Sequence, residues 1–258
     1  YARAVIKKLY AHRETRLHRA LRKLGLREPL LREYTMPKID EVRSYGIKDQ
    51  HGTLRQIPPT HRDKPIVSIT RNPFLRYVSN YLYRWWEHYP PADPDEIRKT
   101  FPTFPRLSFE DYYEMSHQFS RANRLKDIQP HTDLGIHSVQ FIQFYFHEPE
   151  HMLRSLDDST LRAGDFGKDM GDVTFLHQER LTTELRDFLV KMGAERYELV
   201  FMGSMERLNI SEPQSSKGEG KDYWGYYKNS ELVERVLQRD ALLFTLFPEY
   251  RTEAERNL

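Results

Sequence analysis

Residues 65–81 read PIVSITRNPFLRYVSNY and give the clearest structural signal in the sequence. Its first part, up to Thr70, is a short β-branched run bounded by polar residues, which is typical of a buried central strand. Asn72 and Pro73 interrupt the run, and apolar residues then recur at helical spacing from Phe74 to Leu82. Pro73 fits the first position of a helix, where its missing N–H is not needed. The stretch therefore predicts a strand, a tight turn and a helix.

Helical patterns lie on both sides of this unit. Apolar residues at three- and four-residue multiples predict one amphipathic helix over residues 1–24. Further helices are predicted over 108–117, 136–147, 178–192 and 229–246, and short strands at 175–176 and 199–202. Strands that alternate with helices favour an α/β fold, with a mostly parallel central sheet flanked by helices on both faces. The Pro-rich residues 89–106 are expected to form a long loop that covers a site.

The composition fits one folded domain over residues 1–258. The formal net charge of +2 argues against wholesale binding to nucleic acid. The absence of cysteine excludes disulfides, a thiolate nucleophile and a Cys-ligated metal. No apolar run approaches the roughly 18 residues of a membrane span, and no signal-peptide pattern is visible. A cytoplasmic location is the simplest expectation.

The N-terminal part of the sequence is basic. Residues 1–33 hold ten Lys or Arg against three acids, a local excess of 10 − 3 = +7. Such a run is more often a solvated helix face, and the alternative is a surface that attracts an anionic ligand or a membrane. No capping residue precedes Tyr1, so we expect the sequence to begin inside a helix, with a further segment upstream.

Arg71 and Ser79 form a candidate anion site. Arg71 follows the predicted central strand directly, and open α/β sheets bind their ligands at this end of a strand. The next helix offers its N-terminal N–H groups and the positive end of its dipole, and an Arg fork can hold a phosphate by two hydrogen bonds. Ser79, eight residues later, can add a hydroxyl donor. The alternative is that Arg71 pairs with a surface carboxylate and Ser79 is ordinary helix surface.

The same residues carry a family resemblance. Arg71-Asn-Pro, followed by Ser79-x-Tyr81, is similar to the motif with which sulfotransferases bind their co-substrate, 3′-phosphoadenosine 5′-phosphosulfate (PAPS). In that family a strand ends in Arg, and a Ser eight residues later completes the contact with the 3′-phosphate. The resemblance implies that Arg71 and Ser79 bind this phosphate, on the P-loop-NTPase-like fold of the sulfotransferases.

A later segment extends the resemblance. Residues 216–224, SKGEGKDYW, resemble the basic glycine loop of the family, which reads Arg-Lys-Gly and then Gly-Asp-Trp. The resemblance implies that Lys217 and the backbone of Gly218 close over the same phosphate. The segment departs from the pattern, because Ser216 replaces the Arg and one extra residue precedes Trp224. A surface loop without a ligand is the alternative.

Two weaker similarities, at residues 175–181 and 226–247, resemble the strand followed by Glu-x-Leu and the closing helix of the family. Glu179 in the first of them is expected to be structural. The family loop that binds the 5′-phosphosulfate, Lys-x-Gly-Thr/Ser, does not occur in this sequence, and we expect it upstream of Tyr1. No metal is expected, because His131 and His137 are poorly spaced for a pair of ligands on one helix face.

The expected catalytic base is His51. Sulfuryl transfer needs in-line positioning and removal of a proton from the acceptor, and His is the commonest base near neutral pH. His51 lies in the loop that leads to the strand before Arg71, where similar family members carry their catalytic His. His61 is the main rival, and an acidic base or another His is also open. The aromatic cluster around Trp85 and Trp86 is expected to be core, and the alternative is a wall of the acceptor pocket or a ring that stacks on adenine.

The sequence thus predicts an enzyme that transfers a sulfuryl group from PAPS to the hydroxyl or amine of a small-molecule, carbohydrate or lipid acceptor. Two alternatives remain open. One is a nucleotide-binding or scaffold protein of the same fold without catalytic activity. The other is a P-loop-type nucleotide kinase, because the folds are related.

Overall fold

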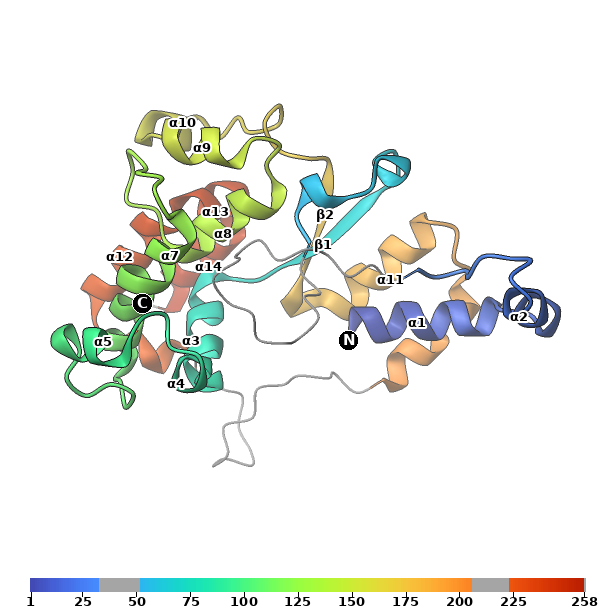
Figure 1. Ribbon diagram of the computed structural model, residues 1–258, viewed down its shortest axis with the longest axis horizontal. Helices are drawn as coiled ribbons and strands as arrows, with labels where there is room; N and C mark the ends of the chain where they lie inside the picture. The colour runs from blue at the N-terminus through green and yellow to red at the C-terminus, as the bar shows by residue number, and fades with distance from the viewer. Residues whose placement is uncertain (33–51, 206–222, 258) are drawn as a thin grey trace.

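The computed structural model describes residues 1–32, 52–205 and 223–257, which are mostly helical (Figure 1). Two strands, β1 (Ile66–Thr70) and β2 (Val173–His177), pair in parallel within the described residues. Ile66 lies opposite Val173 and Thr70 lies opposite His177, so both strands end at the same edge. The predicted strands at 65–70 and 175–176 are therefore confirmed.

The side chains of the two strands contribute to two separate hydrophobic cores. Phe175 packs against the larger core, whereas Val67 and Leu176 belong to the smaller one. Figure 1 shows the large helical bundle on one side of the strands and α1 with α11 on the other. The coarse prediction of helices combined with parallel strands is confirmed. The wider parallel sheet flanked by helices on both faces stays a prediction, because the sheet in the described residues has two strands.

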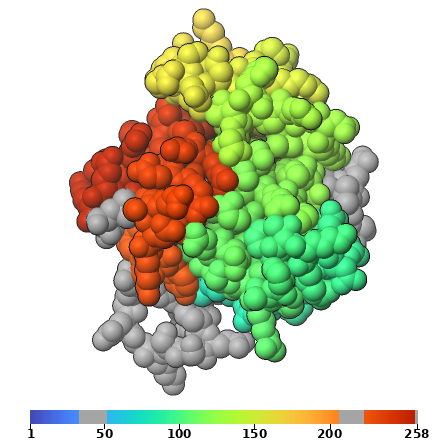
Figure 2. Space-filling view, turned by 90° about the vertical axis from the view of Figure 1, so that its left-hand side faces the viewer, coloured from blue at the N-terminus to red at the C-terminus, as the bar shows by residue number. Residues whose placement is uncertain are grey.

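The larger core is built by helices from the middle and the end of the chain. They are α3 (Pro73–Tyr83), α4 (Trp85–His88), α5 (Pro94–Thr100), α6 (Phe109–Met115), a π-helical turn (Ser116–Arg121), α7 (Ala122–Leu125), α8 (Ile136–Tyr145), α9 (Pro149–Ser155), α10 (Asp158–Ala163), α12 (Ser230–Arg239), α13 (Ala241–Leu246) and α14 (Pro248–Asn257). Figure 2 shows C-terminal segments, in orange and red, packed against green segments from the middle of the chain.

The smaller core is built by α1 (Ala2–Arg13), α11 (Leu181–Lys191) and the 3₁₀ helix η5 (Arg196–Ser204), with α2 (Arg16–Lys23) beyond α1. Short 3₁₀ helices connect the remaining elements. They are η1 (Leu54–Gln56), η2 (Pro59–His61), η4 (Gln178–Arg180) and η6 (Tyr223–Tyr226).

Two predicted helices are interrupted. The single helix over 1–24 is wrong, because Glu14 is extended (φ −75°, ψ 102°) and Thr15 starts α2 by accepting a hydrogen bond from the N–H of His18 at 3.1 Å. The predicted helix over 229–246 is divided into α12 and α13 at Asp240. At the first break, the side chain of Thr15 accepts a hydrogen bond from the backbone of α2. At the second, the side chain of Asp240 accepts hydrogen bonds from buried groups.

Two other segments also differ from the sequence-based expectation. The prediction of a long loop over 89–106 is wrong, because these residues include α5. Ile97, Phe101 and Phe104 are also buried in the larger core. The strand over 199–202 is wrong as well. These residues belong to η5, where Leu199 and Met202 are buried while Val200 is 75% exposed. Burial therefore repeats at a spacing of three residues, as a 3₁₀ helix requires, and not at the spacing of two that a strand gives.

A buried carboxylate holds three parts of the larger core together. Asp240 is fully buried and accepts a hydrogen bond from the Tyr77 hydroxyl at 2.8 Å. It also accepts bonds from the N–H and the hydroxyl of Ser138, at 2.9 and 3.0 Å. Burial raises the pKa of Asp240, and these hydrogen bonds oppose the rise. Asp240 thus joins α3, α8 and the junction of α12 and α13.

The close approach of Asp240 to Gly135 gives a stability test. A Cβ added at Gly135 would lie 2.5 Å from Asp240 Oδ1, whereas one added at Gly203 would meet no atom within 4 Å. We expect Gly135→Ala to lower the free energy of unfolding by about 1–3 kcal/mol, as overpacking does. The control Gly203→Ala should change it by less than about 0.5 kcal/mol. Urea unfolding measures both variants, and equal stabilities would contradict the role of Asp240.

Candidate functional site

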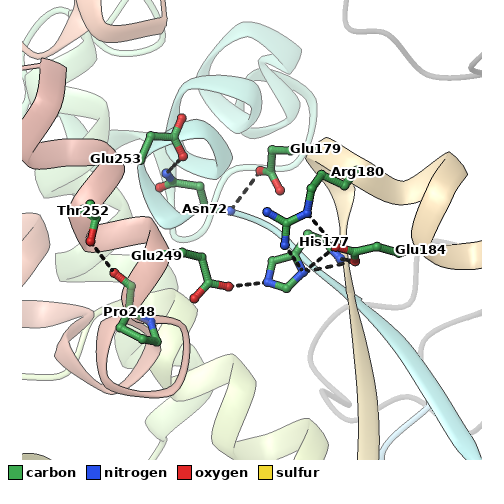
Figure 3. A network of polar contacts seen from close by, with 9 residues as sticks. All are labelled: Asn72, His177, Glu179, Arg180, Glu184, Pro248, Glu249, Thr252 and Glu253. Carbon is green, nitrogen blue, oxygen red and sulfur yellow. Dashed lines mark hydrogen bonds and ion pairs between the residues drawn. The ribbon is translucent and has the colours of Figure 1, made fainter.

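The candidate site lies at the edge of the sheet where both parallel strands end. Arg71 and Asn72 follow β1 directly, and Glu179 follows β2. Figure 3 shows this edge, with side chains from the ends of the two strands and from α14 gathered around it. Ligands of parallel α/β sheets bind at this end of the strands. The topology therefore places the sequence motif at the edge where a ligand site is expected.

Asn72 fixes the turn between β1 and α3. Its buried side chain accepts a hydrogen bond from the N–H of Phe74 at 3.0 Å and donates one to Glu253 Oε2 of α14 at 2.8 Å. Its own N–H donates to Glu179 Oε1 at 3.3 Å. Pro73 occupies the first helical position, as predicted. Because the N–H of Phe74 already donates to Asn72, this N–H is not available to a ligand. The start of α3 therefore favours an anion mainly through its helix dipole.

Arg71 is a partly buried cation at this edge. Burial lowers the pKa of its guanidinium, and the nearby polar groups of Tyr223, Glu179 and Tyr250 oppose this shift. No hydrogen bond or ion pair joins the guanidinium to any residue that the structure describes. The alternative in which Arg71 pairs with a surface carboxylate is therefore not seen among these residues. A partly buried charge without such a partner is costly, and an anion at this place would compensate it.

A second cation lies one turn into α3. Burial lowers the pKa of Arg76, the charge of Arg71 lowers it further, and Asp240 opposes both effects. The Arg76 guanidinium donates a hydrogen bond to Gln140 on α8. Ser79 is half-buried and lies three residues after Arg76, which places both on the same side of α3. The convergence of Arg71 and Ser79 on one phosphate stays a prediction.

The other predicted site residues lie mostly outside the described part of the chain. His51, Lys217 and Gly218 fall there. The described chain resumes at Tyr223, which opposes the lowering of the Arg71 pKa by burial. His61 belongs to η2, which precedes β1, and a strand of five residues spans about 16 Å. His61 therefore lies towards the opposite edge of the sheet, which makes it a poor candidate for a base acting beside Arg71.

His177, the last residue of β2, lies at the same edge and was not predicted from the sequence. Its Nδ1 lies 3.1 Å from both carboxylate oxygens of Glu184 on α11, and its Nε2 contacts Glu249 of α14. Its backbone N–H donates to Glu184 Oε2 at 2.5 Å, and Arg180 binds the same carboxylate at 2.7 Å. Each ring nitrogen thus faces a carboxylate, so His177 connects the strand to α11 and α14 (Figure 3) and is poorly placed to take a proton from a substrate. Its position directly after the predicted strand at 175–176 was the sequence feature that could have indicated His177.

The aromatic cluster divides into two parts. Trp86 is buried, and its ring stacks on Tyr81 and packs against Tyr112, with centroid distances of 5.7 and 4.5 Å. Tyr83 is 65% exposed and stacks on the partly exposed Trp85. The expectation of core packing is therefore confirmed for Trp86. A role of Tyr83 and Trp85 in an acceptor pocket stays a prediction.

His137 is buried among cations. It is 2% exposed, its ring lies 4.1 Å from that of Tyr77, and neither ring nitrogen has a hydrogen-bond partner among the described residues. Burial lowers the pKa of His137 well below its ordinary value, and the charges of Arg76, Arg124 and Arg71 lower it further. His137 is therefore neutral in the folded protein near neutral pH, and its protonation opposes folding.

This shift predicts a pH dependence of stability. The folded pKa of His137 is lowered, so at pH values between it and the unfolded value of about 6.5 the unfolded chain binds more protons. Stability should then fall as the pH drops below about 6.5. We expect the loss between pH 7 and pH 5 to be about 2 kcal/mol smaller in His137→Phe than in the wild type. Urea unfolding at the two pH values measures this, and parallel losses would contradict it.

The described part of the chain holds no group of three or more His, Asp or Glu side chains arranged to bind a metal ion. Comparisons with known proteins add no further constraint. No family model, no curated protein and no solved structure matches the chain.

Proposed function

We propose that this protein is a PAPS-dependent sulfotransferase, and the observation that carries the proposal is the environment of Arg71. The guanidinium is partly dehydrated, lies at the ligand-binding edge of parallel strands, and has no ion pair with a described residue. A phosphate accepts two parallel hydrogen bonds from such a fork and neutralises its charge. Arg76 and the start of α3 add positive potential at the same place.

The resemblance to the sulfotransferase motif indicates which phosphate would bind here. Arg71 and Ser79 would bind the 3′-phosphate of the nucleotide, and Lys217 with the backbone of Gly218 would close over it. Tyr223 near Arg71 supports this assignment, because it is the first described residue after Lys217 and follows it by six residues in the sequence. The two parallel strands would belong to a wider sheet flanked by helices on both faces, as in the P-loop-like fold.

The proposed reaction is an in-line displacement at sulfur. The acceptor oxygen or nitrogen forms a bond to sulfur while the bond from sulfur to the 5′-phosphate oxygen breaks. The acceptor proton passes to His51, and the products are a sulfated acceptor and 3′,5′-bisphosphoadenosine. Small molecules, carbohydrates and lipids with a hydroxyl or amine are the acceptors that this chemistry allows.

Arg71→Ala tests the nucleotide site. We expect the variant to bind 3′,5′-bisphosphoadenosine at least tenfold more weakly in calorimetric titrations, because a charge-assisted bidentate contact is worth about 1.5–3 kcal/mol. The unliganded variant should unfold at the same urea concentration as the wild type or a higher one, because Arg71 has no ion pair with a described residue to lose. If Arg71 were purely structural, the variant would unfold at a lower urea concentration and bind the nucleotide as tightly as the wild type.

The matched control for this test is Arg98→Ala. Arg98 lies on α5 and forms a surface ion pair with Asp95 at 2.5 Å. Its loss should leave nucleotide affinity unchanged. Equal affinity of the wild type and Arg71→Ala for the nucleotide would overturn the proposed role of Arg71.

His51→Ala tests the base. We expect turnover with PAPS and an accepted acceptor to fall by about 10²–10⁴-fold while nucleotide affinity stays nearly intact. The control His61→Ala removes a histidine from the opposite edge of the sheet and should retain turnover. If His51→Ala keeps full activity, another residue is the base.

A further inference from the structure

Helix α2 presents an apolar face that the described fold leaves uncovered. The apolar residues of α1 are used for packing, since Val5 and Leu9 are buried in the smaller core. In α2 no residue is buried, and Leu17 is 70% exposed. The residues that follow continue this surface, because Leu24, Leu26 and Leu30 are 71%, 69% and 41% exposed. Figure 1 shows α2 at the outer end of α1, away from the large bundle.

The exposed leucines are held by a defined local structure. Thr15 caps the start of α2, and Gly25 ends the helix with φ 72°, a backbone conformation that favours glycine. The N–H of Leu26 then donates to the carbonyl of Leu21 at 2.9 Å, as in the Schellman motif. His18 Nε2 lies 3.0 Å from the carbonyl of Glu28, which ties residues 26–28 back to the helix. These contacts order most of the segment that carries Leu17, Leu24, Leu26 and Leu30, which we call the leucine patch.

The segment that carries the leucine patch has an excess of positive charge. Residues 14–32 contain six Lys or Arg and two acids, a net charge of 6 − 2 = +4. Glu14 pairs with Arg19 and Arg22, at 3.2 and 2.8 Å. Arg16, Lys23 and Arg27 form no ion pair with a residue that the structure describes. The surface therefore combines exposed leucines with cations whose charge is not neutralised by neighbouring carboxylates.

We propose that α2 and residues 24–30 bind the surface of an anionic lipid bilayer. Leucines on one face of a basic helix enter the boundary between headgroups and acyl chains, while Lys and Arg contact anionic headgroups. A nucleic acid would match the charge of this surface but not its leucines, since phosphate contacts dominate such binding. No helix in the described ranges 1–32, 52–205 and 223–257 is long and apolar enough to cross a bilayer, so the proposal concerns contact with one leaflet.

Vesicle co-sedimentation tests this proposal. The full chain should sediment with vesicles of phosphatidylcholine and phosphatidylserine, at least fivefold more than with phosphatidylcholine alone. The double variant Leu17→Asn/Leu24→Asn and the charge variant Arg16→Glu/Lys23→Glu should each lose most of this binding. Val200→Asn is the matched control, because Val200 is an equally exposed apolar residue on η5, outside the leucine patch. Circular dichroism confirms that each variant is folded.

Several outcomes would overturn the proposal. One is that the wild type sediments with neither vesicle. Another is that the leucine variant binds as well as the wild type, which would reduce the effect to charge alone. A third is a wild-type dimer that the leucine variant loses while vesicles are not bound, which would make the leucine patch an interface between copies. Equal loss of binding in Val200→Asn would also contradict the role of the patch.

Discussion

The parallel pairing of β1 with β2 is the constraint on which the candidate site depends. The register that places Thr70 opposite His177 makes both strands end together, so the residues after them lie at one edge. Asn72 then connects this edge to Glu179 after β2 and to Glu253 on α14. Arg71 is left partly buried near Glu179 and forms no ion pair with a described residue. An anion bound beside Arg71 would compensate this charge.

The larger core is held by a different kind of constraint. Asp240 replaces water with three protein hydrogen bonds, from Tyr77 and Ser138, and so fixes α3 relative to α8 and α12. Because Arg76 on α3 also interacts with Asp240 and Gln140, the position of the candidate site is coupled to this buried network. The site and the core are thus connected through α3, which carries Arg76 and Ser79 on one side and Tyr77 in the core.

Sequence reasoning succeeded where structure is local. The β-branched run, Asn72 and Pro73 predict the strand, the turn and the start of α3, because propensity and capping are encoded within a few residues. The predictions failed where the local structure depends on residues that are far away in the sequence. The break between α12 and α13 coincides with Asp240, whose partners lie more than 100 residues earlier, and the bridging role of His177 requires Glu249 from α14. The break after Glu14 could have been predicted, since Thr15 is a good helix cap. The leucines, however, recur at helical spacing on both sides of the break and indicated one continuous helix.

In the proposed function, Arg71 binds a phosphate attached to the 3′-position of a ribose. Calorimetric titration of the wild type and Arg71→Ala with 3′,5′-bisphosphoadenosine and with adenosine 5′-monophosphate isolates this one contact. We expect the 3′-phosphate to increase the affinity of the wild type at least tenfold and to give much less benefit in Arg71→Ala. Equal affinity of the wild type for the two nucleotides, or an equal benefit in both proteins, would contradict it.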